Sequence, residues 1–351
     1  MKKVTIRDIA KAAGVAPSTV SRAFKSTERL SSDTTRRIFE IAERMGYELP
    51  SASSDADGAP RPTHALRRLA GIVVGDLTDP YCAAVVHAAE HECFGHGFSL
   101  VVGESRDSLA WERLAFDTLA AQCDGVMMLA PRMAGPDIRE AAERQAVVLA
   151  NRNVKGVSNI VVDLSGGVGQ AMNLFAMRGY RRVSYLSGPS QLADDAARVK
   201  ELEAACEEQG LELRHMWPGE PTFEGGASFV DKYLADPTGA VIAYNDDMAL
   251  GFSAALRSHG MRLPEDCSVI GFGDSLAARS GVPPLTTVRM GAEELGTGLA
   301  RLLLRKLERP EETAEASYAT VASSLVVRGS VGTAAADGQT TSNVTEDVDK
   351  N

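Results

Sequence analysis

Short apolar runs alternate with helical stretches along the chain from residue 69 onward. A first series of runs covers residues 69–74, 98–102, 125–129, 146–150 and 160–162. A second series covers residues 182–186, 240–243 and 268–272. Strands that are buried on both faces form nearly continuous apolar runs, and their alternation with helices favours parallel sheets. Because the two series are similar in size, we expect two α/β lobes with about eight strands in all.

The first fifty residues follow a different, helical pattern. Ile6, Ile9 and Ala13 share one face of a first helix, and Thr5 followed by Asp8 has the form of a capping box. Gly14 supplies a tight turn before a second helix over residues 17–24, and a third helix is expected over residues 32–45. Two short helices joined by a glycine turn and braced by a third form a helix-turn-helix unit.

Composition marks the segments between and after these parts. Residues 51–62 contain no large apolar side chain, which is typical of a linker. From residue 331 the chain is rich in Ala, Thr, Asp and Asn without aromatic residues, which predicts a disordered tail. The expected domains are a head (1–50), an atypical hinge or linker (51–68), a two-lobe core (69–330) and the tail (331–351).

The overall composition limits the class of protein. Of 351 residues, 44% are apolar and 24% are charged, as in globular proteins, and no apolar run approaches the ~18 residues of a membrane span. Because the first residues are charged, we expect no secretory signal there. Five scattered cysteines fit neither a disulfide framework nor a zinc ribbon, so we expect a cytoplasmic protein.

The charge is unevenly distributed along the chain. The net charge is −10, yet residues 1–37 hold nine Lys and Arg against three Asp and Glu, a net of +6. A basic head on an acidic body indicates a nucleic-acid-binding module, although a solvated basic helix face explains the same tally equally well. In the second helix Val20 and Ala23 are placed to pack inward, while Ser18 and Arg22 are left to contact phosphates and base edges.

The head also carries a specific motif. The segment Val-Thr-Ile-Arg-Asp-Ile-Ala-Lys-Ala-Ala-Gly-Val-Ala-Pro-Ser-Thr-Val-Ser-Arg, residues 4–22, resembles the N-terminal signature of the LacI/GalR family of transcriptional repressors. The resemblance implies double-stranded operator DNA as a partner, with the second helix in a major groove. Base edges would be contacted by Pro17, Ser18, Arg22 and Arg29, and phosphates by Thr5, Thr19, Ser21, Lys25, Ser31 and Thr34.

The resemblance continues to residue 330, through segments such as Gly179–Arg182 and Leu325–Ser330. It implies a core like the periplasmic sugar-binding proteins, with two α/β lobes and a small-molecule effector between them. Polar residues that follow the strands, aromatic residues that could stack on a sugar, and an arginine placed by the resemblance make up the candidate effector site. They are Asp76, Tyr81, Asn151, Arg152, Arg198, Phe223, Asn245 and Asp274. For each polar residue, a helix cap or a structural hydrogen bond is the alternative role.

Three departures from the family pattern bear on function. Gly273 stands where the family usually has an aspartate that contacts the effector, so Asp274 substitutes for it or the contact is lost. Ala16 replaces a helix-capping serine. The linker is longer and more acidic than the family's hinge helix, and only Leu66 offers a candidate for its minor-groove wedge, so we expect weaker DNA bending or effector coupling.

Two short motifs suggest enzymes instead. His87-Ala-Ala-Glu-His91 has the spacing of an inverted zinc peptidase motif, and Gly273-Asp-Ser-Leu276 spells an esterase tag. The first also fits an ordinary helix of the first lobe, and the second lacks the downstream histidine block that the esterases need. We therefore expect no enzyme activity, no cofactor and no metal site.

The sequence predicts a ligand-responsive, sequence-specific transcriptional regulator, a repressor controlled by a sugar or a similar small molecule. It would act in the cytoplasm as a homodimer, or as a tetramer, because one three-helix head contacts too few base pairs for specificity. The alternative is a sugar-binding or enzymatic α/β protein whose head binds a protein partner. Binding to a pseudo-palindromic DNA fragment distinguishes the two.

Overall fold

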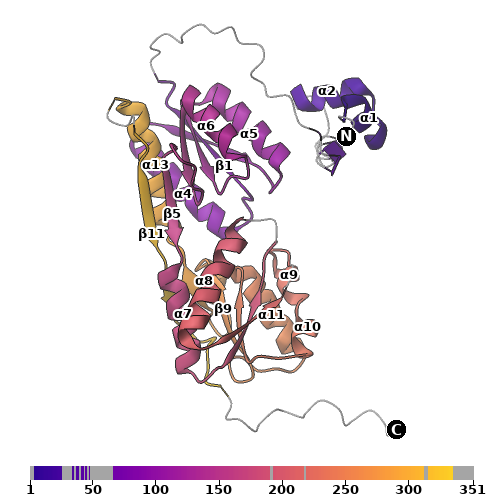
Figure 1. The fold of residues 1–351 in the computed structure, drawn as a ribbon, viewed down its shortest axis with the longest axis vertical. Helices are drawn as coiled ribbons and strands as arrows, with labels where there is room; N and C mark the ends of the chain where they lie inside the picture. Colours follow the sequence, from indigo (N-terminus) through magenta and orange to yellow (C-terminus); the bar gives the residue numbers. More distant parts are fainter. Residues whose placement is uncertain are drawn as a thin grey trace. The chain divides into compact units, whose positions relative to one another are not determined.

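The structure is a computed structural model that describes residues 4–25, 34, 37–38, 41–42, 44–45, 47, 66–189, 193–216, 219–311 and 315–334. Beyond the linker, the chain divides into two compact units (Figure 1). The first unit comprises the chain up to Val161 and the later segment Ala292–Ala319, which returns to it. The second comprises Val162–Gly291 and the chain from Thr320. The expectation of two α/β lobes is therefore confirmed, with three chain crossings between them.

The head contains α1 (Ile6–Ala13) and α2 (Pro17–Lys25), joined by a turn in which Gly14 adopts φ 65°. That backbone conformation favours glycine, as the sequence suggested. A small apolar core forms where Ile9 and Val20, both fully buried, meet Ile38 from the third helical segment. Phe24 stacks on Tyr47 at 5.6 Å between ring centroids, which closes the head around α2.

The first unit is built on a six-stranded sheet with the order β11-β5-β4-β3-β1-β2. Its strands are β1 (Leu69–Val74), β2 (Ser99–Glu104), β3 (Gly125–Leu129), β4 (Ala146–Ala150), β5 (Asn159–Asp163) and β11 (Tyr318–Ala322). The pairs from β2 to β5 are parallel. The carboxyl ends of these strands therefore lie along one edge of the sheet, where open α/β sheets bind ligands.

Helices cover both faces of this sheet (Figure 1). One face packs against α5 (Leu109–Gln122) and α6 (Gly135–Arg144), whose Leu119 and Ile138 join Val73 in a common core. The other face packs against α13 (Ala292–Glu308), which in turn packs closely on α4 (Pro80–Gly95). The continuous apolar runs of β1 and β3 follow from this two-sided burial.

The second unit repeats the arrangement with the strand order β12-β10-β9-β8-β6-β7. Its strands are β6 (Arg182–Leu186), β7 (Glu212–Met216), β8 (Ala240–Ala243), β9 (Ser268–Phe272), β10 (Thr286–Arg289) and the antiparallel β12 (Ser324–Val326). Its helices are α7 (Ser165–Met177), α8 (Ala193–Gln209), α9 (Phe223–Ala227), α10 (Val230–Leu234), α11 (Asp246–Ser258) and α12 (Leu276–Ser280).

The structure contains four described strands that the apolar pattern does not predict, namely β7, β10, β11 and β12. They are short or rich in polar residues, so they do not form apolar runs. In β10, for example, Thr286 and Thr287 are fully buried, and hydrogen bonds to Arg328 and Asp246 satisfy their hydroxyls. Tertiary contacts rather than hydrophobicity determine this strand.

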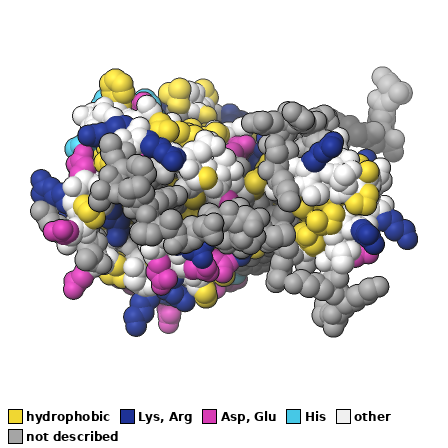
Figure 2. Space-filling model, turned by 90° about the horizontal axis from the view of Figure 1, so that it is seen from above, with side chains coloured by type: hydrophobic (Ala, Val, Ile, Leu, Met, Phe, Trp, Pro, Cys, Tyr) yellow, Lys and Arg dark blue, Asp and Glu magenta, His cyan; other side chains and the backbone are white. Residues whose placement is uncertain are grey.

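The described chain also extends past residue 330. The backbone N–H of Gly332 donates to Ser268 Oγ at 2.8 Å, and that of Ala334 donates to the Arg178 carbonyl at 2.8 Å. These four residues, 331–334, belong to the second unit, and the rest of the predicted tail lies outside the described residues. On the face shown in Figure 2, basic and acidic side chains are interspersed, and the acidic side chains do not form a single patch there.

Candidate functional site

Helix α2 has a buried face and a polar face. Val20 and Ala23 are completely buried in the head core, while Ser18 and Arg22 are exposed. Residues four positions apart lie next to each other on a helix surface, so Ser18 and Arg22 form one polar stripe. A small hydroxyl and a guanidinium beside each other can contact a phosphate and a guanine edge from the same helix face.

The other predicted DNA contacts differ in exposure. Thr5 and Pro17 are exposed, whereas Thr19, Ser21 and Thr34 are half-buried. The side chain of Lys25, together with Arg29 and Ser31, lies outside the described residues. The backbone N–H and the hydroxyl of Thr5 both donate to Asp8 Oδ2, at 2.9 and 2.6 Å. These two bonds join Thr5 to the first turn of α1, as the capping-box pattern predicted.

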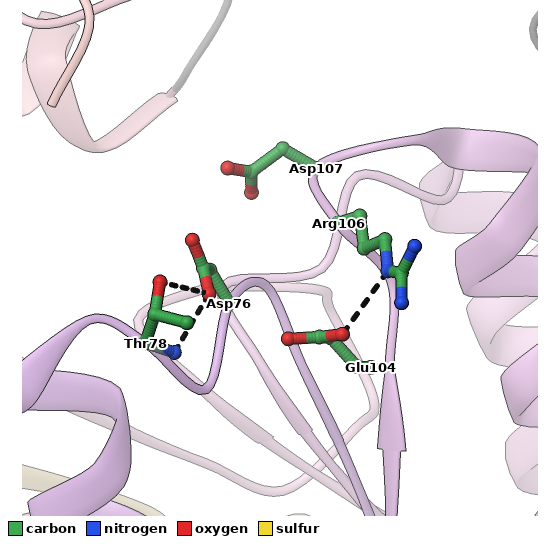
Figure 3. A pocket seen from close by; sticks show the side chains of 5 residues that line it. All are labelled: Asp76, Thr78, Glu104, Arg106 and Asp107. Carbon is green, nitrogen blue, oxygen red and sulfur yellow. Dashed lines mark hydrogen bonds and ion pairs between the residues drawn. The ribbon is translucent and has the colours of Figure 1, made fainter. Parts of the chain in front are cut away.

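The first unit has a pocket of about 360 Å³ at the carboxyl ends of β1 and β2 (Figure 3). It is lined by Asp76, Thr78, Glu104, Arg106 and Asp107. Asp76 Oδ1 accepts hydrogen bonds from the hydroxyl and the backbone N–H of Thr78, both at 2.7 Å, and Glu104 pairs with Arg106 at 3.2 Å. The pocket therefore presents three carboxylates and one guanidinium, which suits a ligand rich in hydroxyl groups.

Asp107 is exposed as a whole residue, but the surrounding protein crowds its carboxyl group. Burial raises the pKa of Asp107; Arg132 opposes the shift, while Asp76 and Asp79 add to it. An added side-chain carbon at Gly75 would lie 2.8 Å from Asp107 Oδ1, so the glycine leaves room for this carboxyl group.

Among the predicted effector residues of this unit, Asp76 lines the pocket, and the other three lie elsewhere along the sheet edge. The Tyr81 backbone N–H donates to Asp79, the N-cap of α4. Asn151 follows β4 with φ 53°, and its backbone N–H donates to the Ile160 carbonyl at 3.0 Å. Arg152 is half-buried near Glu112, a buried carboxylate that accepts hydrogen bonds from the loop after β3.

Arg198 is a buried predicted effector residue of the second unit. It projects from α8 and is 6% exposed. Its guanidinium lies 3.9 Å from the ring centroid of Tyr244 and 5.3 Å from that of Phe272. Tyr244 directly follows β8, and Phe272 is the last residue of β9. Arg198 therefore covers the carboxyl edge of the second sheet. Stacking on two aromatic rings fixes the guanidinium plane, and Nη2 also donates to Met290 Sδ at 3.7 Å.

The structure assigns a capping role to one further predicted residue. Asn245 is the N-cap of α11: its side chain accepts from the Met248 N–H at 2.9 Å and donates to the Pro221 carbonyl at 2.9 Å. Phe223 begins α9 and is 46% exposed, so its ring is accessible for stacking.

Asp274 is engaged by protein groups on both of its oxygens. Arg289 and Arg279 donate to Oδ2, at 2.6 and 3.1 Å, and Arg328 donates to Oδ1. Burial alone would raise the pKa of Asp274, but the hydrogen bonds from Arg328 and Arg289 outweigh it and the pKa is lowered. With three guanidinium partners, the carboxylate has little capacity left for the effector contact that the sequence suggested for it.

Several residues of these edges are absent from the sequence-based set. Glu104 ends β2, and Arg106 and Asp107 follow it, which is the same signal that selected Asp76 after β1. Arg279, Arg289 and Arg328 come from three separate segments, and no local pattern relates them to Asp274. Among the described residues, no group of three or more His, Cys, Asp and Glu side chains is placed to hold a metal ion. No helix in the same ranges is long and apolar enough to cross a membrane.

A helix-turn-helix head followed by two largely parallel sheets, each with polar groups gathered at its carboxyl edge, defines the class of DNA-binding regulators with a ligand-binding core. Residues 5–49 match the family model of bacterial regulatory proteins of the lacI family. Residues 172–331 match the model of the periplasmic binding protein-like domain.

Individual relatives agree with these matches. The chain is 31% identical to the HTH-type transcriptional regulator GalS of Salmonella typhimurium, over 82% of this chain and 85% of GalS. It is 30% identical to GalR of Escherichia coli, over 86% and 88% of the two chains. The solved structure of the transcriptional regulator CelR in complex with cellobiose matches with a TM-score of 0.67 and 27% identity, covering 93% of this chain and 100% of that one. The chain belongs to the LacI family of HTH-type transcriptional regulators.

Proposed function

We propose that this regulator is a repressor whose α2 binds operator DNA in a major groove. The observation that carries the proposal is the exposed stripe of Ser18 and Arg22 on α2, opposite a fully buried face. Pro17 would approach base edges beside them, while Thr5, Thr19, Ser21 and Thr34 would contact phosphates. Lys25, Arg29 and Ser31 complete the proposed interface on the basis of the sequence.

The proposed effector is a sugar-like small molecule that binds at the carboxyl edges of the two sheets. The carboxylates of Asp76 and its pocket neighbours can pair with vicinal hydroxyls, and Arg198 offers a fixed guanidinium edge. The cellobiose in the related CelR structure supports this ligand class. Tyr81, Asn151, Arg152, Phe223 and Asn245 remain proposed contributors, whereas Asp274 would act through its arginine partners.

We further propose that the chain works as a homodimer, or as a tetramer, in the cytoplasm beside its DNA. Two heads read two half-sites, which gives the specificity that a single head lacks. A ligand that binds one arrangement of the core more tightly than another would change how the heads are held. We infer no catalytic activity for this chain.

The decisive experiment is a mobility-shift titration of the full-length protein on a pseudo-palindromic fragment from near its own gene. Specific retardation with two protein chains per fragment is the expected result. Retardation that random DNA of the same length competes away equally well would contradict operator recognition. A thermal-shift screen of mono- and disaccharides on the same preparation then identifies effectors, each of which is added back to the mobility-shift assay.

A further inference from the structure

The second unit concentrates three arginines around a single carboxylate. Arg289 donates to Asp274 Oδ2 through Nε and Nη2, at 2.8 and 2.6 Å. Arg279 donates to the same oxygen at 3.1 Å, and Arg328 occupies Oδ1. The cluster therefore holds three positive charges and one negative charge. Its arginines repel one another, and Asp274 alone offsets only part of that repulsion.

The nearest acidic neighbour does not restore the balance. Asp246 is buried, and its two oxygens accept hydrogen bonds from the Thr287 hydroxyl at 2.6 Å and from the Ser275 N–H at 2.7 Å. Burial raises the pKa of Asp246. Even when Asp246 is counted as fully charged, three arginines face only two carboxylates. The Arg279, Arg289 and Arg328 cluster, which we call the arginine cluster, thus has an excess of positive charge.

The three arginines differ in what remains available to a ligand. Arg328 is largely buried, with a side chain 16% exposed, and it also donates to the Leu285 carbonyl, so its role is structural. The side chains of Arg279 and Arg289 are 56% and 50% exposed. Both are held by the same Asp274 oxygen, so their donating nitrogens lie within about 6 Å of each other. The guanidinium edges that do not contact Asp274 are available for a second oxyanion.

The position of the cluster in the sheet also favours ligand binding. Asp274 lies just beyond β9, and Arg289 is the last residue of the parallel β10, so both are at the carboxyl edge. Gly273 precedes Asp274 with φ 130°, and a carbon added to it would lie 3.3 Å from Asp246 Oδ2. Because Gly273 has no side chain, the position between Phe272 and Asp274 contributes no carboxylate that would neutralise the arginines.

We propose that Arg279 and Arg289 bind the phosphate group of a phosphorylated small molecule. The inference rests on the proposed ligand-responsive function and narrows its effector to an anionic, phosphate-bearing compound. A phosphate monoester carries about −1.5 to −2 at neutral pH, which matches the excess charge of the cluster better than a single carboxylate does. Two planar guanidinium edges suit the oxygens of phosphate.

The test is a calorimetric titration of the full-length protein with inorganic phosphate, at constant ionic strength maintained with NaCl. Saturable binding is expected for the wild type, with phosphate bound more tightly than acetate. Arg279→Gln should weaken phosphate binding about tenfold or more, because it removes a charge-assisted hydrogen-bond donor. In this variant Arg289 and Arg328 still donate hydrogen bonds to Asp274. Arg279→Lys retains the positive charge but lacks the planar guanidinium with its paired donors, so its affinity for phosphate should be intermediate.

The matched control is Arg262→Gln, which removes an exposed arginine of the same unit that pairs with Asp266. It should bind phosphate as the wild type does. Absence of saturable binding, equal affinity for acetate, or equal losses in Arg279→Gln and Arg262→Gln would each overturn the proposal. Operator binding is measured separately on each variant. A wild type that binds phosphate but no operator would refute the proposed repressor function, whereas a reduced DNA affinity in ligand-free Arg279→Gln would reassign the cluster to DNA phosphates.

Discussion

Replacing Asp274 by asparagine tests whether the three-arginine contact stabilises the second unit. The variant Asp274→Asn keeps the shape of the side chain and removes its charge. The side chain of Asp274 is 2% exposed and that of Arg328 is 16% exposed, so this pair behaves as a buried ion pair. Breaking such a pair costs about 3–5 kcal/mol, and because Arg279 and Arg289 are half exposed we expect the lower end, about 3 kcal/mol.

The pH dependence of that loss follows from the lowered pKa of Asp274. A carboxyl group with a lowered pKa in the folded state contributes its stability above the unfolded-state value, which is about 3.9 for aspartate. The contribution disappears as the pH falls through the folded-state pKa. Urea unfolding followed by circular dichroism should therefore show the full difference between wild type and Asp274→Asn at pH 7, and a shrinking difference below about pH 4.

The control for this experiment is Asp266→Asn, which breaks the pair with Arg262, whose side chain is 72% exposed. A pair of this kind is worth at most about 1 kcal/mol. The reasoning is refuted if Asp274→Asn loses no more stability than Asp266→Asn at pH 7. A loss that stays constant down to pH 3 would likewise show that charge is not its cause.

Three further predictions concern DNA, ligand and packing. Arg22→Ala should cost about 1–3 kcal/mol of operator affinity and relax the base preference. Lys25→Ala should weaken binding to all DNA sites evenly and flatten the salt dependence of binding. Mobility shifts on the operator and on mutated operators distinguish the two outcomes. Arg198→Ala should abolish the effector response and spare operator binding in the same assay, and the reverse pattern would reject its ligand role. Gly296→Ala should destabilise the first unit by about 1–3 kcal/mol in urea unfolding, because the added carbon would lie 2.2 Å from a backbone carbonyl of α4. Gly169→Ala, which has no neighbour within 4 Å, should be neutral or slightly stabilising.

The sequence predicted the head in some detail. The capping contact of Asp8, the left-handed Gly14 and the burial of Val20 all follow from rules that relate neighbours along one helix or turn. The core strands β1, β3, β4, β6, β8 and β9 were predicted with the bounds that the structure has, because burial on both faces leaves a continuous apolar run. By contrast, β10 is buried through threonines, and β7, β11 and β12 lie at sheet edges, so none of these strands has a continuous apolar run that would predict it.

The candidate site residues divide in the same way. Placing polar residues after apolar strands identified Asp76, because the carboxyl edge of a parallel sheet is fixed by strand direction alone. The same rule selected Asn245, whose role as an N-cap depends on contacts with Met248 and Pro221. Sequence spacing alone does not distinguish a side chain that caps a helix from one that faces a ligand.

By itself, the sequence determined the family, the basic helix-turn-helix head and the two α/β lobes, since these depend on local periodicity, turn chemistry and an extended motif. Only the tertiary structure decided what surrounds Asp274. Its partners Arg279, Arg289 and Arg328 lie between 5 and 54 residues away along the chain. Their convergence is set by parallel strand order and by the return of the C-terminal segment to the second sheet, and electrostatic balance depends on distances in space rather than on positions in sequence.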